Sequence, residues 1–69
     1  MHRFAYECSR IDAAIRQIAR LRRQRTAVGD ADYQRALDYE ICEHERIVEL
    51  LRSHIEREMQ RDRPLLHRA

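Results

Sequence analysis

The sequence predicts an all-α protein, a two-helix antiparallel hairpin with one tight turn. Apolar residues recur every three or four positions in two long stretches, as they do along one face of a helix. Gly29 is the only glycine and separates the two stretches, and the only proline, Pro64, follows the second. Because two helices cannot enclose a core, we expect the hairpin to complete a four-helix bundle as a homodimer or to pack on a helical partner.

The chain is small for a domain that folds without help. With 69 residues it is expected to bury only about 60% of its unfolded surface, and scaffolds of this size usually need disulfides, a metal or oligomerisation. Its composition, 43% hydrophobic and 38% charged with one glycine, is typical of long-helix or coiled-coil proteins. No apolar run reaches the roughly 18 residues of a membrane span, and the first residues lack the apolar stretch of a signal peptide. We therefore expect a cytoplasmic protein without membrane contact.

The first helix is predicted over about residues 4–27. The segment Ser9-Arg10-Ile11-Asp12 has the form of a capping box, which would begin the helix at residue 10. The apolar spacing before that segment favours a start near residue 3 instead. The expected apolar face consists of Phe4, Cys8, Ile11, Ile15, Ile18 and Leu21, with Ala14 and Ala19 beside it.

The turn is predicted at residues 28–31. Gly29 suits the left-handed position that follows many helices, and Asp30 suits the N-cap of the next helix. That second helix is expected over about 31–62, because Pro64 disfavours helical geometry at the residue before it. Residues 1–63 thus form the hairpin, with the longer second helix overhanging near Met59, and 64–69 form a C-terminal tail. The second apolar stripe is Tyr33, Leu37, Ile41, His44, Val48, Leu51, Ile55 and Met59, widened by Ala36, Ile47 and Leu50.

Charge is divided between the two predicted helices. Residues 1–28 contain seven arginines and two acids, a net +5, whereas residues 30–63 contain six arginines and ten acids, a net −4. One interpretation is that the basic and acidic helices attract each other in the antiparallel pair. The alternative is a nucleic-acid-binding stripe on the first helix, formed by Arg10, Arg16, Arg20 and Arg23.

The cysteines and histidines do not predict a catalytic or metal site. Cys8 and Cys42 would differ in height by about 12 Å, which is too far for a disulfide, so we expect two free thiols. The pairs Glu40/His44 and His54/Glu58 would lie about 15 Å apart and cannot share one ion. His44 is expected to be a half-buried polar residue within the stripe. We therefore predict no enzyme activity and no cofactor.

The segment Gly29-Asp30-Ala31-Asp32-Tyr33-Gln34, together with the later Leu37, Ile41, Ile47, Val48, Leu50 and Leu51, resembles a family of small bacterial type III secretion co-chaperones. These are the E-type partners that help hold the needle subunit, and the resemblance covers roughly residues 15–55. It implies a cytoplasmic heterodimer in which a tetratricopeptide-like chaperone covers the apolar face of the hairpin.

A second resemblance is to the Rop family of plasmid copy-number proteins, which are homodimeric RNA-binding hairpins. The segment Asp30-Ala31-Asp32-Tyr33-Gln34 is similar to the turn of that family, and Ile41-Cys42-Glu43 is similar to part of its second helix. This resemblance implies RNA binding through the first helix, which is the basic one here.

The sequence therefore favours a non-enzymatic interaction module, a small co-chaperone or regulator that buries its apolar helical face on a partner. The alternative is a homodimeric bundle that binds RNA through its first helix. The expected partner-binding residues are Phe4, Ile11, Ile15, Ile18, Ile47, Leu50, Leu51 and Ile55.

Overall fold

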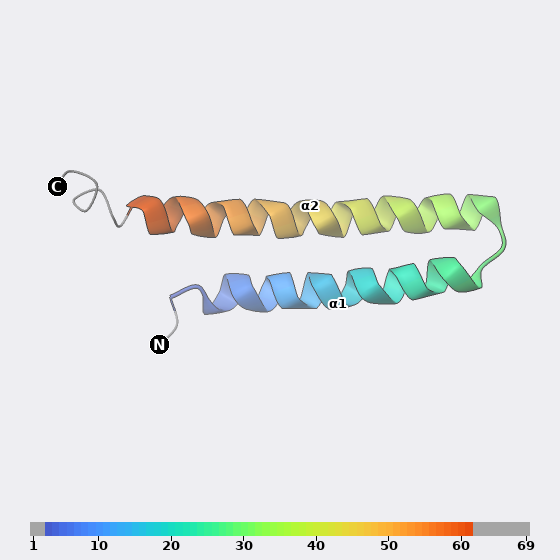
Figure 1. Ribbon diagram of the computed structural model, residues 1–69, viewed down its shortest axis with the longest axis horizontal. Coiled ribbons are helices and arrows are strands. Elements are labelled where there is room, and N and C mark those ends of the chain that lie inside the picture. Colours follow the sequence, from blue (N-terminus) through green and yellow to red (C-terminus); the bar gives the residue numbers. More distant parts are fainter. Residues whose placement is uncertain (1–2, 62–69) are drawn as a thin grey trace.

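The computed structural model describes residues 3–61 and contains two antiparallel helices in a single layer (Figure 1). Helix α1 spans Ala5–Ala27 and helix α2 spans Ala31–Arg61. The all-α hairpin predicted from the sequence is confirmed, and the helix bounds lie within one residue of the predicted ones. The proposed C-terminal tail, 64–69, lies outside the described residues.

Helix α1 begins near the earlier of the two predicted starts. Phe4 occupies its N-cap position without a side-chain hydrogen bond to the backbone, and the amide of Cys8 donates to the carbonyl of Phe4 at 2.9 Å. Ser9 therefore lies inside the helix and does not cap it. The apolar spacing was the better guide to this boundary, since it continues through the capping-box segment.

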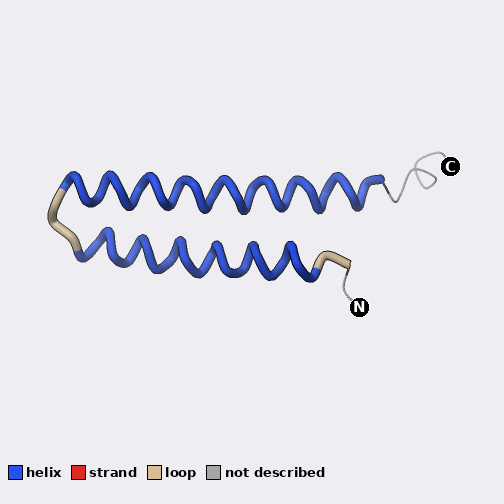
Figure 2. Tube along the Cα trace, turned by 180° about the vertical axis from the view of Figure 1, so that it is seen from behind, coloured by secondary structure: helices blue, strands red, loops and turns tan. Residues whose placement is uncertain are grey.

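The loop at residues 28–30 confirms one prediction and corrects another (Figure 2). Asp30 is the N-cap of α2, because its Oδ1 accepts a hydrogen bond from the Asp32 amide at 2.9 Å. Gly29, however, does not adopt a left-handed conformation: its φ is not positive, and the chain leaves α1 through an extended Val28. The carbonyl of Val28 instead accepts a 2.6 Å hydrogen bond from the side-chain amide of Gln34. A residue in the first turn of α2 therefore caps the end of α1.

The core is a narrow row of side chains between the two helices. The buried residues are Ala14, Ile18 and Leu21 from α1, and Leu37, Ile41 and Val48 from α2, and Ile11 packs against them. No side chain in the described chain is completely buried. Because the core is a single narrow row, the hairpin makes few of the buried apolar contacts that normally stabilise a domain.

The face of α1 that packs on α2 is rotated relative to the predicted face. Ala14 lies at the centre of the contact, whereas Ile15 is 44% exposed and Cys8 is exposed. Successive residues of a helix are about 100° apart, so a centre at Ala14 moves its neighbour Ile15 to one side.

Ion pairs connect the basic α1 to the acidic α2, which supports the first interpretation of the charge division. Arg25 contacts Asp38 at 2.6 Å and Arg22 contacts Glu45 at 2.7 Å. At the open end of the hairpin, Arg3 approaches Glu58 at 3.5 Å. Helix α2, with 31 residues, extends beyond the 23-residue α1 as predicted, and Met59 is 46% exposed.

Candidate interaction surface

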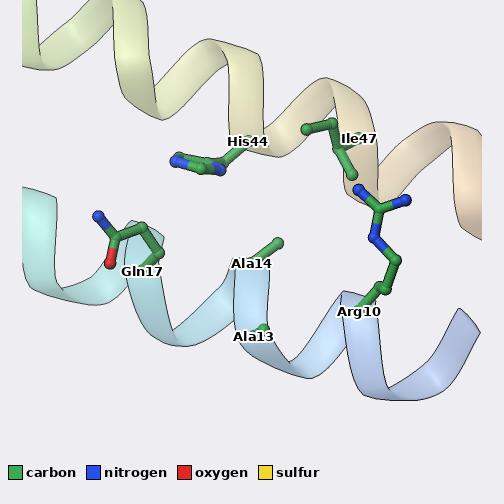
Figure 3. A pocket seen from close by; sticks show the side chains of 6 residues that line it. All are labelled: Arg10, Ala13, Ala14, Gln17, His44 and Ile47. Atoms are coloured by element: carbon green, nitrogen blue, oxygen red, sulfur yellow. The ribbon is translucent and has the colours of Figure 1, made fainter. Parts of the chain in front are cut away.

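One side of the hairpin carries a shallow, open groove between the helices, with a volume of about 230 Å³. We call this side the groove face. Figure 3 shows Arg10 and Gln17 reaching from α1 toward α2, while His44 and Ile47 approach from the opposite helix. The residues that line the groove are Arg10, Ala13, Ala14, Gln17, His44 and Ile47.

The apolar surface of the groove face continues outward on α2. Ile47 is half-buried at the groove, and Leu50, one turn further along α2, is 62% exposed. On the α1 side the exposed residues at the groove are Arg10 and Ala13, and the short side chain of Ala13 leaves the helix backbone open to approach. The groove face thus has a large apolar edge on α2 and a small one on α1.

The opposite side of the hairpin is bridged by charged side chains, and we call it the ion-pair face. Ala13 and Ile15 flank the buried Ala14, so they project to opposite sides of α1. Arg22 lies seven residues after Ile15 and therefore on the same side as Ile15. Its guanidinium contacts Glu45 at 2.7 Å, next to the contact between Arg25 and Asp38.

The predicted partner-binding residues do not form one surface. Ile47 lines the groove, Leu50 adjoins it one turn further along on the outer side of α2, and Leu51 is half-buried. Ile15 lies on the ion-pair face, away from Ile47. Ile18 is only 8% exposed and belongs to the internal core, so in the hairpin it is not available to a partner. Phe4, Ile11 and Ile55 are half-buried.

Three of the four predicted nucleic-acid-binding arginines share one side of α1. Arg16, Arg20 and Arg23 are spaced by four and three residues, so they form an exposed stripe on the outer side of α1, with Arg20 at its edge toward the groove face. Arg16 approaches Asp12 at 3.9 Å, whereas Arg20 and Arg23 form no ion pair with the described residues. Arg10 is separated from this stripe because it lines the groove and lies over the ring of Tyr6.

The two histidines of the described helices, His44 and His54, are half-buried polar side chains. His44 is half-buried at the groove, as predicted from its position in the stripe. His54 approaches Glu7 across the helices at 3.7 Å. Within residues 3–61, no group of three potential metal ligands is brought together. Cys8 and Cys42 are free, as predicted, and both are exposed.

Two features of this surface were not predicted from the sequence. Gln17 lines the groove, and Gln34 closes the end of α1. Glutamines carry no periodic signal, and only the spacing of Gln17 from Ala14, which lies one turn earlier, places it near the core row.

Neither helix of the described chain contains an apolar stretch that could cross a lipid bilayer. Comparisons with protein-family models, with curated proteins and with solved structures gave no match.

Proposed function

We propose that the protein is a non-enzymatic interaction module, a small co-chaperone or regulator, whose groove face is covered by another protein chain. The observation that carries this proposal is the open apolar groove beside Ile47 and Leu50. Within residues 3–61 no side chain is completely buried, so covering Ile47 and its exposed neighbour Leu50 adds the apolar burial that the hairpin lacks.

The groove has the character of a contact surface and not of a reaction site. It is shallow, and among residues 3–61 no carboxylate, hydroxyl or thiol side chain lines it, so His44 has no nucleophile or acid of this part of the chain beside it there. Two exposed free thiols suit a reducing compartment, which fits a cytoplasmic protein.

The test compares substitutions on the two sides of the hairpin. Ile47→Asp and Leu50→Asp place a charge on the groove face, and Ile15→Asp places the same charge on the ion-pair face. We expect the wild-type chain and Ile15→Asp to elute from a lysate of the source cells in an assembly larger than one chain. Ile47→Asp and Leu50→Asp should elute as single chains, because an unpaired carboxylate is costly to bury. The proposal would be wrong if all four proteins eluted alike.

A second candidate function is nucleic-acid binding by the stripe of Arg16, Arg20 and Arg23. It is favoured by the exposure of all three side chains and by the absence of an ion pair at Arg20 and Arg23 among the described residues. Phosphate contacts by this stripe would make RNA affinity fall steeply between low and high salt. An RNA titration at two salt concentrations tests it, with Arg16→Glu, Arg20→Glu and Arg23→Glu as the variants that should lose binding. Affinity unchanged in these variants would exclude this function.

A further inference from the structure

We infer that the chain covering the groove face is a second copy of this protein, arranged so that α1 of each copy lies on α2 of the other and both loops lie at the same end. This inference rests on the proposed function and names its partner. It is carried by the unpaired charges and the complementary shape of the groove face.

The charges at the two edges of the groove face are opposite and unpaired. Arg20 lies seven residues after Ala13, and Glu40 lies seven residues before Ile47, so each lies on the same side of its helix as a groove residue. Both side chains are exposed, and neither forms an ion pair within residues 3–61. The groove face therefore presents a free cation on its α1 edge and a free anion on its α2 edge.

These two charges also lie at nearly the same height along the hairpin. Arg20 lies about two turns before the end of α1, and Glu40 lies about two and a half turns after the start of α2. A twofold axis parallel to the helices leaves every height unchanged and exchanges the two edges. Two copies related in this way bring Arg20 of each copy opposite Glu40 of the other.

The shape of the groove face favours the same arrangement. Ala13 on the α1 edge and Ile47 on the α2 edge line the same groove, so they too lie at similar heights. When α1 of one copy lies on α2 of the other, each Ile47 faces an Ala13. A large side chain opposite a small one is the pairing that lets two helical layers interdigitate.

The other twofold arrangement is disfavoured by charge. An axis perpendicular to the helices puts the loops at opposite ends and lays α1 on α1 and α2 on α2. On the groove face, α1 presents Arg10 and Arg20, and α2 presents Glu40, none of them in an ion pair within residues 3–61. That arrangement would therefore juxtapose like charges along both contacts, whereas the proposed arrangement pairs opposite ones.

A distance between the two loops tests the inference directly. Gly29 accepts a side chain, because its φ is not positive and a Cβ there meets nothing within 4 Å. The full chain with Cys8→Ser, Cys42→Ser and Gly29→Cys carries one spin label per copy, at the loop. Pulsed electron paramagnetic resonance should give a separation of about 15–25 Å, which reflects neighbouring helices and the label arms. A separation of about 45 Å, the length of α2, would overturn the inference. The inference would also be overturned if the protein were monomeric and no interaction between two labels were detected.

Charge exchange provides an independent measurement on the same dimer. Arg20→Glu and Glu40→Arg should each weaken dimerisation about tenfold, because each introduces two like-charge contacts per dimer. The double variant Arg20→Glu/Glu40→Arg should restore the wild-type dissociation constant, measured by sedimentation. Matched reversals at Arg23 and Glu49, which lie off the groove face, should change it little. No rescue in the double variant would overturn the pairing.

The two proposals fail in different ways. If the purified wild-type chain stays monomeric while Ile47→Asp still breaks a larger assembly in the lysate, the second copy is excluded and a different protein covers the groove. If Ile47→Asp changes no assembly at all, the proposed function itself is wrong.

Discussion

The two sides of the hairpin differ in how completely they are satisfied within one chain. On the ion-pair face, Arg22 and Arg25 reach across to Glu45 and Asp38, so charged groups of both helices are paired. On the groove face, none of the residues that line the groove forms an ion pair within residues 3–61, and the groove between the helices is open. We infer from this difference that the charged groups of the ion-pair face find partners within one chain, whereas the groove face needs a second chain to cover it.

The contrast depends first on the shared core that holds the helices together. Leu37, at the loop end of that core, is only 3% exposed, and Leu37→Ala should reduce the free energy of unfolding by about 2–5 kcal/mol. A loss of that size would unfold a marginal hairpin and remove both faces together. Tyr39, which is 68% exposed, provides the control: Tyr39→Ala should cost less than about 0.5 kcal/mol. Equal losses in urea titrations followed by circular dichroism would contradict the assigned core.

The loop fixes the relative placement of the helices and hence the register of both faces. Asp30→Ala removes the N-cap of α2 and should cost about 1 kcal/mol of unfolding free energy, measured by thermal or urea denaturation. Asp30→Ser keeps an oxygen that can accept the same hydrogen bond, so it should retain most of the stability. A cap role would be excluded if both variants lost the same amount.

The ion-pair face should contribute little energy even though its charges are paired. Arg25 and Asp38 remain about half exposed, and such pairs typically add only about 0.2–1 kcal/mol. Asp38→Asn should therefore lower the free energy of unfolding by about 0.5 kcal/mol at low salt and by less at high salt. Association of the chain should not change. An Asp38→Asn variant that dissociated as readily as Ile47→Asp would contradict the separation of the two faces.

The smallest expected effect is at the loop glycine. Gly29→Ala should leave the stability unchanged or raise it by about 0.4–1 kcal/mol, because an L-residue fits its backbone and loses less entropy on folding. A left-handed glycine would give the opposite sign. The thermal midpoints of the two proteins, measured at equal concentration, distinguish these cases.

The helices and their caps were predictable because their signals are local. The three- and four-residue spacing placed both helices, and Asp30 identified the start of α2. The left-handed Gly29 was a wrong prediction because the Arg25 carbonyl, which such a turn would serve, accepts hydrogen bonds from the Val28 amide and from the side chain of Gln34, both at 3.4 Å. Nothing in the spacing of apolar residues encodes a contact of that kind.

The division into two faces was only partly predictable. Ile47 and Leu50 were identified as a second edge, and the structure places them together. Ile15 was assigned to the same surface because it continues the three- and four-residue spacing of the large apolar residues, with Ala14 beside it. Whether Ala14 or Ile15 points toward α2 depends on how closely the helix backbones approach each other. That approach is decided by packing between the helices and not by either sequence stretch alone.

The measurement that tests the central claim most directly is the thermal unfolding of the purified full chain at several concentrations, with its molar mass from light scattering. If a second copy completes the groove face, folding is coupled to association, and both helicity and Tm should rise with protein concentration. A fully helical monomer whose Tm is the same at every concentration would show that the hairpin is complete alone. That result would contradict the account.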